Sequence, residues 1–95
     1  YLNQKDFDQI LAVVGGREDI LVVVDEAYND FVRAEDYLDT ATSLKKYNNI
    51  LVLRTFSKAY GLAGLRVGAL LAGDPQLINW IHRVRMPFNV NALAQ

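Results

Sequence analysis

The chain has 95 residues, of which 52% are hydrophobic and 22% are charged, and it contains no cysteine. This length and composition are typical of one globular unit, and we find no internal domain boundary within residues 1–95. The lack of cysteine excludes disulfide scaffolds, cysteine-ligated zinc and thiol catalysis, and it is compatible with the cytoplasm, where we expect the protein to be. No apolar run approaches the roughly 20 residues of a membrane helix. Because the chain does not begin with methionine, we expect a piece of a longer protein or a processed product.

The formal net charge of −1 conceals a difference between the two halves of the chain. Residues 1–44 hold three basic and ten acidic residues, whereas residues 45–95 hold seven basic residues and one acidic residue. The basic half could attract an anion such as a phosphate, or the two halves could pair with each other or with further segments. The basic residues are scattered, without a dense run interleaved with aromatic residues, which argues against a nucleic-acid site.

Residues 1–53 are predicted to contain two helices and two strands. Apolar residues at i, i+3, i+4 and i+7 predict an amphipathic helix over 4–14, capped by Asn3. The continuous apolar run 20–24 is typical of a strand buried on both faces of a parallel sheet. A second helix is predicted within 36–47, and it leads into a second strand over 50–53.

The second predicted strand is followed by a structured loop over 54–66 and a third strand over 67–72. Asp74 as N-cap and Pro75 at the first helical position open the next helix, and Asn91 is a candidate cap for another. A strand–helix–strand succession forms a right-handed parallel crossover by default, whereas the loop before the third strand holds no long helix. The sequence therefore predicts an α/β fold with a mostly parallel sheet flanked by helices and an antiparallel third strand.

Two chemistry-bearing segments, 25–28 and 54–58, follow the first two predicted strands. In open α/β sheets, ligands bind beyond the carboxyl ends of parallel strands. If these strands are neighbours, Asp25 and Lys58 project into one crevice, where Arg66 would add a positive charge for a small anionic ligand. Each residue alone also has an ordinary explanation, because Asp25 can cap a turn, Lys58 can be a solvated surface lysine and Arg66 can be a structural ion-pair partner.

The stretch 57–68, SKAYGLAGLRVG, resembles the cofactor-lysine segment of pyridoxal-phosphate-dependent aminotransferases of fold type I. The stretch 24–28, VDEAY, resembles the aspartate strand of the same family. The sequences LRTFSKAY at 53–60 and PFNV at 87–90 are most similar to the histidinol-phosphate aminotransferase branch, although related aromatic aminotransferases and a threonine-phosphate decarboxylase share them. The resemblance implies that residues 1–95 are a central part of the cofactor-binding large domain of such an enzyme.

The resemblance also implies a role for each site residue. Lys58 would be the catalytic lysine that forms a Schiff base with pyridoxal 5'-phosphate and then moves the α-proton of the substrate. Asp25 would pair with the protonated pyridine nitrogen, and Tyr28 would donate to the phenolic oxygen of the cofactor. Glu26 faces the other way in an extended segment and is the weaker candidate. The residues that would hold the cofactor phosphate are Thr55, Ser57 and Arg66.

The function implied by the resemblance is amino-group transfer from L-histidinol phosphate to 2-oxoglutarate, which gives imidazole acetol phosphate and L-glutamate in histidine biosynthesis. Members of this family are homodimers, and we expect no metal, nucleic acid or membrane partner. Two alternatives stay open: another enzyme on the same scaffold, either an aromatic-amino-acid aminotransferase or a threonine-phosphate decarboxylase, and a non-catalytic α/β fragment. Because the family's glycine-rich phosphate cup and its carboxylate-binding arginine are missing from these residues, the isolated chain is expected to be inactive.

Overall fold

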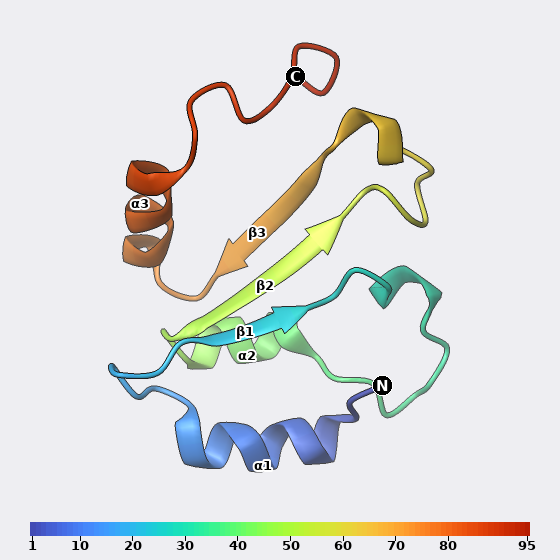
Figure 1. The fold of residues 1–95 in the computed structure, drawn as a ribbon. Coiled ribbons are helices and arrows are strands. Elements are labelled where there is room, and N and C mark those ends of the chain that lie inside the picture. Colours follow the sequence, from blue (N-terminus) through green and yellow to red (C-terminus); the bar gives the residue numbers. More distant parts are fainter.

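A computed structural model describes residues 1–95 and shows one three-stranded sheet with helices packed against it (Figure 1). The elements, in chain order, are α1 (Gln4–Val14), β1 (Val22–Asp25), the 3-10 turn η1 (Asn29–Phe31), α2 (Thr40–Lys46), β2 (Ile50–Thr55), the 3-10 turn η2 (Ala63–Leu65), β3 (Gly68–Ala72) and α3 (Pro75–Val84). The predicted α/β class and the predicted order of helices and strands are confirmed. None of the helices has the length and apolar content that crossing a membrane requires.

The central strand of the sheet is β2, with β1 on one side and β3 on the other (Figure 1). β1 and β2 are parallel, and Asp25 lies opposite Leu53. β2 and β3 are antiparallel, and Thr55 lies opposite Gly68. The predicted parallel crossover and the predicted antiparallel return are thus both confirmed. Because parallel neighbours end at the same edge of a sheet, the segments that follow Asp25 and Thr55 leave the sheet close to each other.

Several predicted boundaries differ from the observed ones, and the third strand begins at Gly68, one residue later than predicted. The first strand includes Asp25, and the second continues to Thr55, because both residues find pairing partners in the neighbouring strand. The first strand also begins two residues later than predicted, at Val22. The helix predicted after Asn91 is wrong, since the structure has only a turn there. The side chain of Asn91 still caps that turn, because its Oδ1 accepts the backbone N–H groups of Leu93 and Ala94, each at 3.1 Å.

The hydrophobic core lies between the sheet and the helices α1 and α2. Its buried members are Phe7, Leu11, Leu38, Ile50 and Val52. Val22 and Val24 of β1 pack against this cluster, whereas Val23 between them is 53% exposed. Because side chains alternate along a strand, Asp25 shares the face of Val23 and points away from the core. The burial pattern of β1 therefore decides on which side of the sheet the Asp25 carboxylate lies.

Each helix begins at a polar residue whose side-chain oxygen accepts a backbone N–H of the first turn, which otherwise lacks a partner. These capping residues are Asn3, Asp39 and Asp74. The caps at Asn3 and Asp74 were predicted from the sequence and are confirmed. The start of α2 was not predicted, and Asp39 fixes it so that Thr40 becomes the first residue of the helix.

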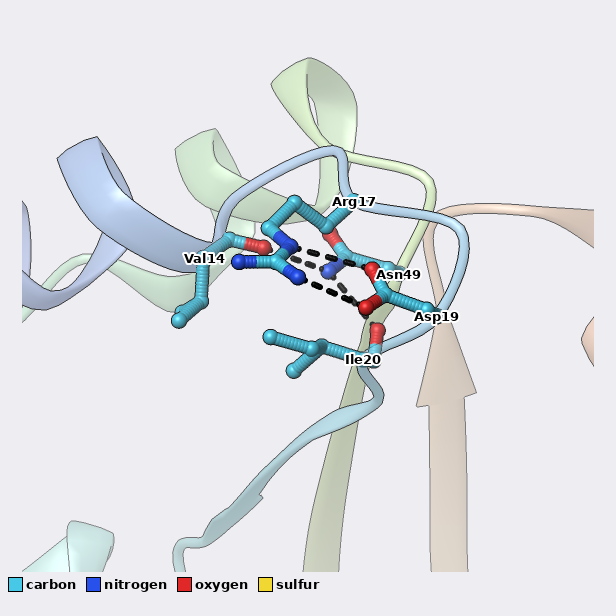
Figure 2. A network of polar contacts seen from close by, with 5 residues as sticks. All are labelled: Val14, Arg17, Asp19, Ile20 and Asn49. Atoms are coloured by element: carbon cyan, nitrogen blue, oxygen red, sulfur yellow. Dashed lines mark hydrogen bonds and ion pairs between the residues drawn. The ribbon is translucent and has the colours of Figure 1, made fainter.

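The side chain of Asn49 fixes the loop between α1 and β1 (Figure 2). Its Oδ1 accepts the Gly16 backbone N–H at 2.7 Å, and its Nδ2 donates to the carbonyl oxygens of Val14 at 2.8 Å and Ile20 at 2.9 Å. Gly16 has a φ of 76°, in the left-handed region that glycine adopts without strain. Asn49 immediately precedes β2, so this network joins the end of α1 to the starts of both parallel strands, at the edge opposite the candidate site.

Candidate functional site

Asp25 is the last residue of β1, and its carboxylate is exposed. The backbone N–H of Ala27 donates to Asp25 Oδ1 at 3.0 Å, a local bond that aspartate commonly makes at a turn. The carboxylate forms no ion pair within the chain. Its negative charge is therefore free to interact with a ligand.

Lys58 and Tyr28 are brought together by the loops that follow β2 and β1. The Lys58 Nζ lies 5.3 Å from the centroid of the Tyr28 ring, within the range of a cation–π interaction. Tyr28 is 62% exposed, and its ring also lies near the ring of Phe31, with a centroid distance of 6.3 Å. Since Tyr28 follows Asp25 by three residues, this contact places the two predicted segments side by side.

The loop that carries Lys58 is closed by its own backbone hydrogen bonds. The Leu62 N–H donates to the Phe56 carbonyl oxygen, and the Gly61 N–H donates to the Lys58 carbonyl oxygen, both at 3.0 Å. Gly61 has a φ of 67°, which favours glycine at this turn. The backbone of Lys58 is thus held in a compact turn at the carboxyl end of β2.

The three residues predicted to hold a phosphate lie at the two ends of the β2–β3 connection. The Ser57 N–H donates to Thr55 Oγ1 at 3.1 Å, so the Thr55 hydroxyl proton remains available to another acceptor. The Phe56 N–H donates to the Val67 carbonyl oxygen at 3.1 Å. Ser57 and Arg66 directly flank this bond on the two chain segments. The backbone therefore brings the serine and the arginine into one region.

Arg66 is exposed and has a φ of 52°, a left-handed conformation that is uncommon outside glycine. Its Nη1 donates to the Ala63 carbonyl oxygen at 3.0 Å, and it forms no ion pair with a carboxylate of the chain. Arg66 is therefore not a structural ion-pair partner within this chain, and its positive charge is available to an anion.

Glu26 lies on the core side of the sheet, in contrast to Asp25. It is 2% exposed, and its carboxylate accepts hydrogen bonds from Thr40 Oγ1 and Arg54 Nε, both at 2.7 Å. Burial and the nearby negative charge of Glu26 raise the pKa of Tyr37, whereas the Arg54 charge lowers it. This arrangement was not predicted from the sequence. The only sequence signal for this ion pair is an acidic residue directly after the first buried strand and a basic residue near the end of the second.

A groove of about 640 Å³ runs along the outer edge of β1, and Asp25 and Tyr28 are among its lining residues. Lys58 and Arg66 do not line it. The groove is mostly apolar and follows the strand edge rather than the carboxyl ends of both parallel strands. We therefore assign the candidate site to the loops after β1 and β2 and not to this groove.

A model of the family described as "Aminotransferase class I and II" matches residues 1–95. The chain belongs to this family. Among curated proteins, it is 50% identical over 95 residues to the histidinol-phosphate aminotransferase of Bdellovibrio bacteriovorus and 46% identical over 94 residues to histidinol-phosphate aminotransferase 2 of Haemophilus influenzae. The alignments cover 100% and 99% of this chain and 25% of each relative. The chain thus spans about a quarter of the length of these curated aminotransferases.

Solved structures of aminotransferase relatives share the fold of the chain. The histidinol-phosphate aminotransferase of Sinorhizobium meliloti, in complex with pyridoxal-5'-phosphate, has a TM-score of 0.76 and 33% identity, covering 90% of this chain and 22% of that one. The L-threonine-O-3-phosphate decarboxylase of Porphyromonas gingivalis has a TM-score of 0.79 and 29% identity, covering 98% and 27%. The Clostridium acetobutylicum histidinol-phosphate aminotransferase, with a TM-score of 0.83 but 20% identity, supports the fold alone.

Proposed function

We propose that the chain is the central part of the large domain of a pyridoxal-5'-phosphate-dependent aminotransferase that transfers the amino group of L-histidinol phosphate to 2-oxoglutarate. The observation that carries the chemistry is the position of the Lys58 amine over the ring of Tyr28, three residues after an Asp25 carboxylate that has no cationic partner. The choice of substrate is supported by curated relatives that are 50% and 46% identical over nearly the whole chain.

The residues at the carboxyl ends of β1 and β2 fit pyridoxal 5'-phosphate. A phosphorylated pyridine aldehyde requires an amine for the aldehyde, an anion for the protonated ring nitrogen and donors for the phosphate. Lys58 provides the amine and Asp25 provides the anion. The donors for the phosphate are Arg66, whose guanidinium has no carboxylate partner, and the hydroxyls of Thr55 and Ser57.

Each of these side chains has a defined task in the proposed reaction. When bound, the cofactor supplies an electron sink for the carbanion at the substrate α-carbon. Lys58 would hold the cofactor and then carry the proton from the α-carbon, a transfer for which its amine must be neutral. Asp25 would keep the ring nitrogen protonated through its negative charge, and the Tyr28 hydroxyl would donate a hydrogen bond to the phenolic oxygen. Arg66 would bind the phosphate as a planar bidentate donor.

A threonine-phosphate decarboxylase is the second candidate function. The Porphyromonas gingivalis decarboxylase has a TM-score of 0.79 against this chain, compared with 0.76 for the Sinorhizobium meliloti aminotransferase. Both candidate substrates are phosphorylated amines, so a phosphate and an amino group have to be recognised in either case.

For the whole protein we also propose a homodimer in the cytoplasm, as is usual for the family.

The experiment uses the full-length protein that carries these residues, purified with pyridoxal 5'-phosphate. We expect a bound-cofactor absorbance band and glutamate formation from L-histidinol phosphate and 2-oxoglutarate, both lost in Lys58→Ala. Release of carbon dioxide from L-threonine O-3-phosphate without glutamate formation would instead support the second candidate. A protein that binds no cofactor and turns over neither substrate would contradict both functions. Light scattering after gel filtration tests the homodimer.

A further inference from the structure

An ion pair between a buried carboxylate and a guanidinium that is 45% exposed lies on the core side of the sheet, behind the candidate site. The Glu26 side chain is 1% exposed, and its Oε2 accepts a hydrogen bond from Arg54 Nε at 2.7 Å. Its Oε1 accepts a hydrogen bond from Thr40 Oγ1 at 2.7 Å. Both carboxylate oxygens therefore have a partner, and no buried side-chain polar atom in the chain is left without one.

The ion pair joins three elements at one point. Glu26 directly follows β1, and its backbone N–H donates to the Leu53 carbonyl oxygen of β2 at 2.9 Å. Arg54 belongs to β2, and Thr40 is the first residue of α2. The carboxylate of Glu26 thus fixes the carboxyl ends of both parallel strands to each other and to the start of the helix.

The candidate site residues are the chain neighbours of the ion pair. Asp25 precedes Glu26, and Thr55 follows Arg54, so both point to the opposite face of the sheet. Lys58 lies four residues beyond Arg54, in the loop closed by its own backbone bonds. A displacement of one strand end against the other would therefore move Asp25 relative to Lys58.

The two consecutive carboxylates have opposite environments. Glu26 is buried and paired with a guanidinium, whereas Asp25 is exposed and accepts only a backbone N–H. An ion pair with a buried carboxylate is an inefficient source of stability, because the desolvation of that charge offsets much of the attraction. Its hydrogen bonds are directional, however, and a well-packed apolar pair would not hold two strand ends in one register as specifically.

We propose that Glu26 is a positioning residue that, through Arg54 and Thr40, sets the place of the Asp25 carboxylate relative to the Lys58 amine. This inference rests on the proposed aminotransferase function. Misplacement of a reacting group by about 1 Å costs on the order of 100-fold in rate, so a small shift of the strand ends is sufficient for a measurable effect.

The main variant is Glu26→Gln in the full-length holoenzyme, because it preserves the shape and removes the charge. We expect kcat to fall about 10- to 100-fold while KM for L-histidinol phosphate stays within about twofold. The pH midpoint of the bound-cofactor absorbance should move, and amide hydrogen exchange at residue 26 should accelerate in the cofactor-free protein. Arg54→Met should resemble Glu26→Gln, and the double variant should be no worse than either single one, because the two residues act as a unit.

Two controls separate positioning from general stability. Asp19→Asn breaks the exposed Arg17–Asp19 ion pair at the other end of the sheet and should change none of these quantities (Figure 2). Leu11→Ala lowers stability from within the core and should leave the pH midpoint and kcat unchanged.

Thr40→Val removes the hydroxyl that donates to Glu26, and it replaces Glu26→Gln if that variant does not fold. For Thr40→Val we expect a smaller fall in kcat than for Glu26→Gln.

A Glu26→Gln enzyme with the wild-type kcat and pH midpoint would overturn the proposal, as would a Leu11→Ala enzyme that reproduces the same losses. Failure of the proposed function looks different, because the wild-type protein then binds no cofactor and shows no turnover. In that case the amide hydrogen exchange of the cofactor-free protein still tests whether the ion pair holds the strand ends. An unchanged exchange rate at residue 26 in Glu26→Gln overturns the role of the ion pair, and a rate that rises in this variant and not in Asp19→Asn supports it.

Discussion

The amine of Lys58 lies over the aromatic ring of Tyr28, with its Nζ 5.3 Å from the ring centroid. The two residues are 30 positions apart in the sequence, and they meet because β1 and β2 are parallel neighbours whose following loops leave the same edge of the sheet. Both side chains are exposed, so this contact leaves room for a ligand to approach the amine.

The charge of Asp25 is tested with Asp25→Asn in the full-length enzyme. The amide keeps the shape of the side chain and can still accept the Ala27 N–H, but it removes the negative charge. We expect the enzyme to retain its cofactor and to lose about 100-fold in kcat, as is typical for the loss of one electrostatic partner of a transition state. Asp30→Asn, in the neighbouring η1 turn, is the control, and near-normal turnover of Asp25→Asn would remove Asp25 from its proposed role.

Arg66→Ala tests the proposed phosphate contact. A charge-assisted hydrogen bond that is lost on substitution weakens binding about 10- to 100-fold, so we expect the dissociation constant of pyridoxal 5'-phosphate to rise by this factor. Fluorescence titration of the cofactor-free enzyme with pyridoxal 5'-phosphate measures this dissociation constant. Arg66→Lys should recover part of the affinity, because it restores the charge without the bidentate fork. If Arg66→Ala binds the cofactor as tightly as the wild type, the phosphate is held by other residues.

Asn49→Ala tests the network at the opposite edge of the sheet (Figure 2). The substitution removes three hydrogen bonds between a buried side chain and the backbone, so we expect the free energy of unfolding to fall by about 3 kcal/mol. Asn48→Ala is a matched control, because Asn48 is exposed and forms no side-chain hydrogen bond. Urea unfolding of the full-length protein measures both, and equal effects of the two substitutions would contradict the prediction.

The sequence predicted those elements that depend on local patterns. The periodicity of 4–14 predicted α1, and Asp74 with Pro75 predicted the start of α3. The continuous apolar runs predicted the strands, and the lack of a long helix between the second and third strands predicted the antiparallel direction of the third. Each of these signals lies within a short stretch of chain, where helix caps, turns and periodicity follow from local stereochemistry.

The contacts that the sequence did not predict join residues far apart in the chain. Asn49 binds backbone groups 29 to 35 positions earlier, and Arg54 pairs with Glu26, 28 positions earlier. Such pairs depend on the register of β1 against β2, and a shift by one residue would turn every side chain to the other face. Asp39 was missed as a cap because α2 has only seven residues and a weak apolar pattern.

Asp39 predicts a pH dependence of stability. Its pKa lies below the ordinary value of 3.8 because the Thr42 hydroxyl and the Thr42 N–H donate to its carboxylate, at 2.5 and 3.1 Å. A carboxyl group with a lowered folded-state pKa stabilises the protein at pH values above its unfolded-state pKa, and this contribution is lost as the pH falls through the folded-state value. We therefore expect the difference in Tm between the wild type and Asp39→Asn to stay constant above about pH 5 and to shrink as the pH falls from about 5 to about 2. A difference in Tm that stays constant between about pH 5 and about pH 2 would contradict the prediction.

Lys58 is the only lysine after residue 50, and Lys45 and Lys46 lie in the last turn of α2, just before the opposite end of β2. In the full-length holoenzyme, reduction with borohydride should attach the cofactor covalently to the peptide that contains Lys58. Lys58→Ala should abolish transamination, because no other amine is held at the carboxyl ends of β1 and β2. Peptide mass spectrometry identifies the labelled residue, and a label on another lysine would overturn the assignment.

The isolated chain of 95 residues should behave differently from the full-length enzyme, although it contains Lys58. It spans about a quarter of its curated relatives, and both Asp25 and Lys58 are exposed in it. Water therefore has access to both charged groups, and neither the orientation of the cofactor nor the transfer of the α-proton is controlled. We expect weak cofactor binding at most and no measurable glutamate formation, with Lys58→Ala indistinguishable from the unmodified chain. Robust turnover by the purified 95-residue chain would show that the loops after β1 and β2 form a complete site by themselves.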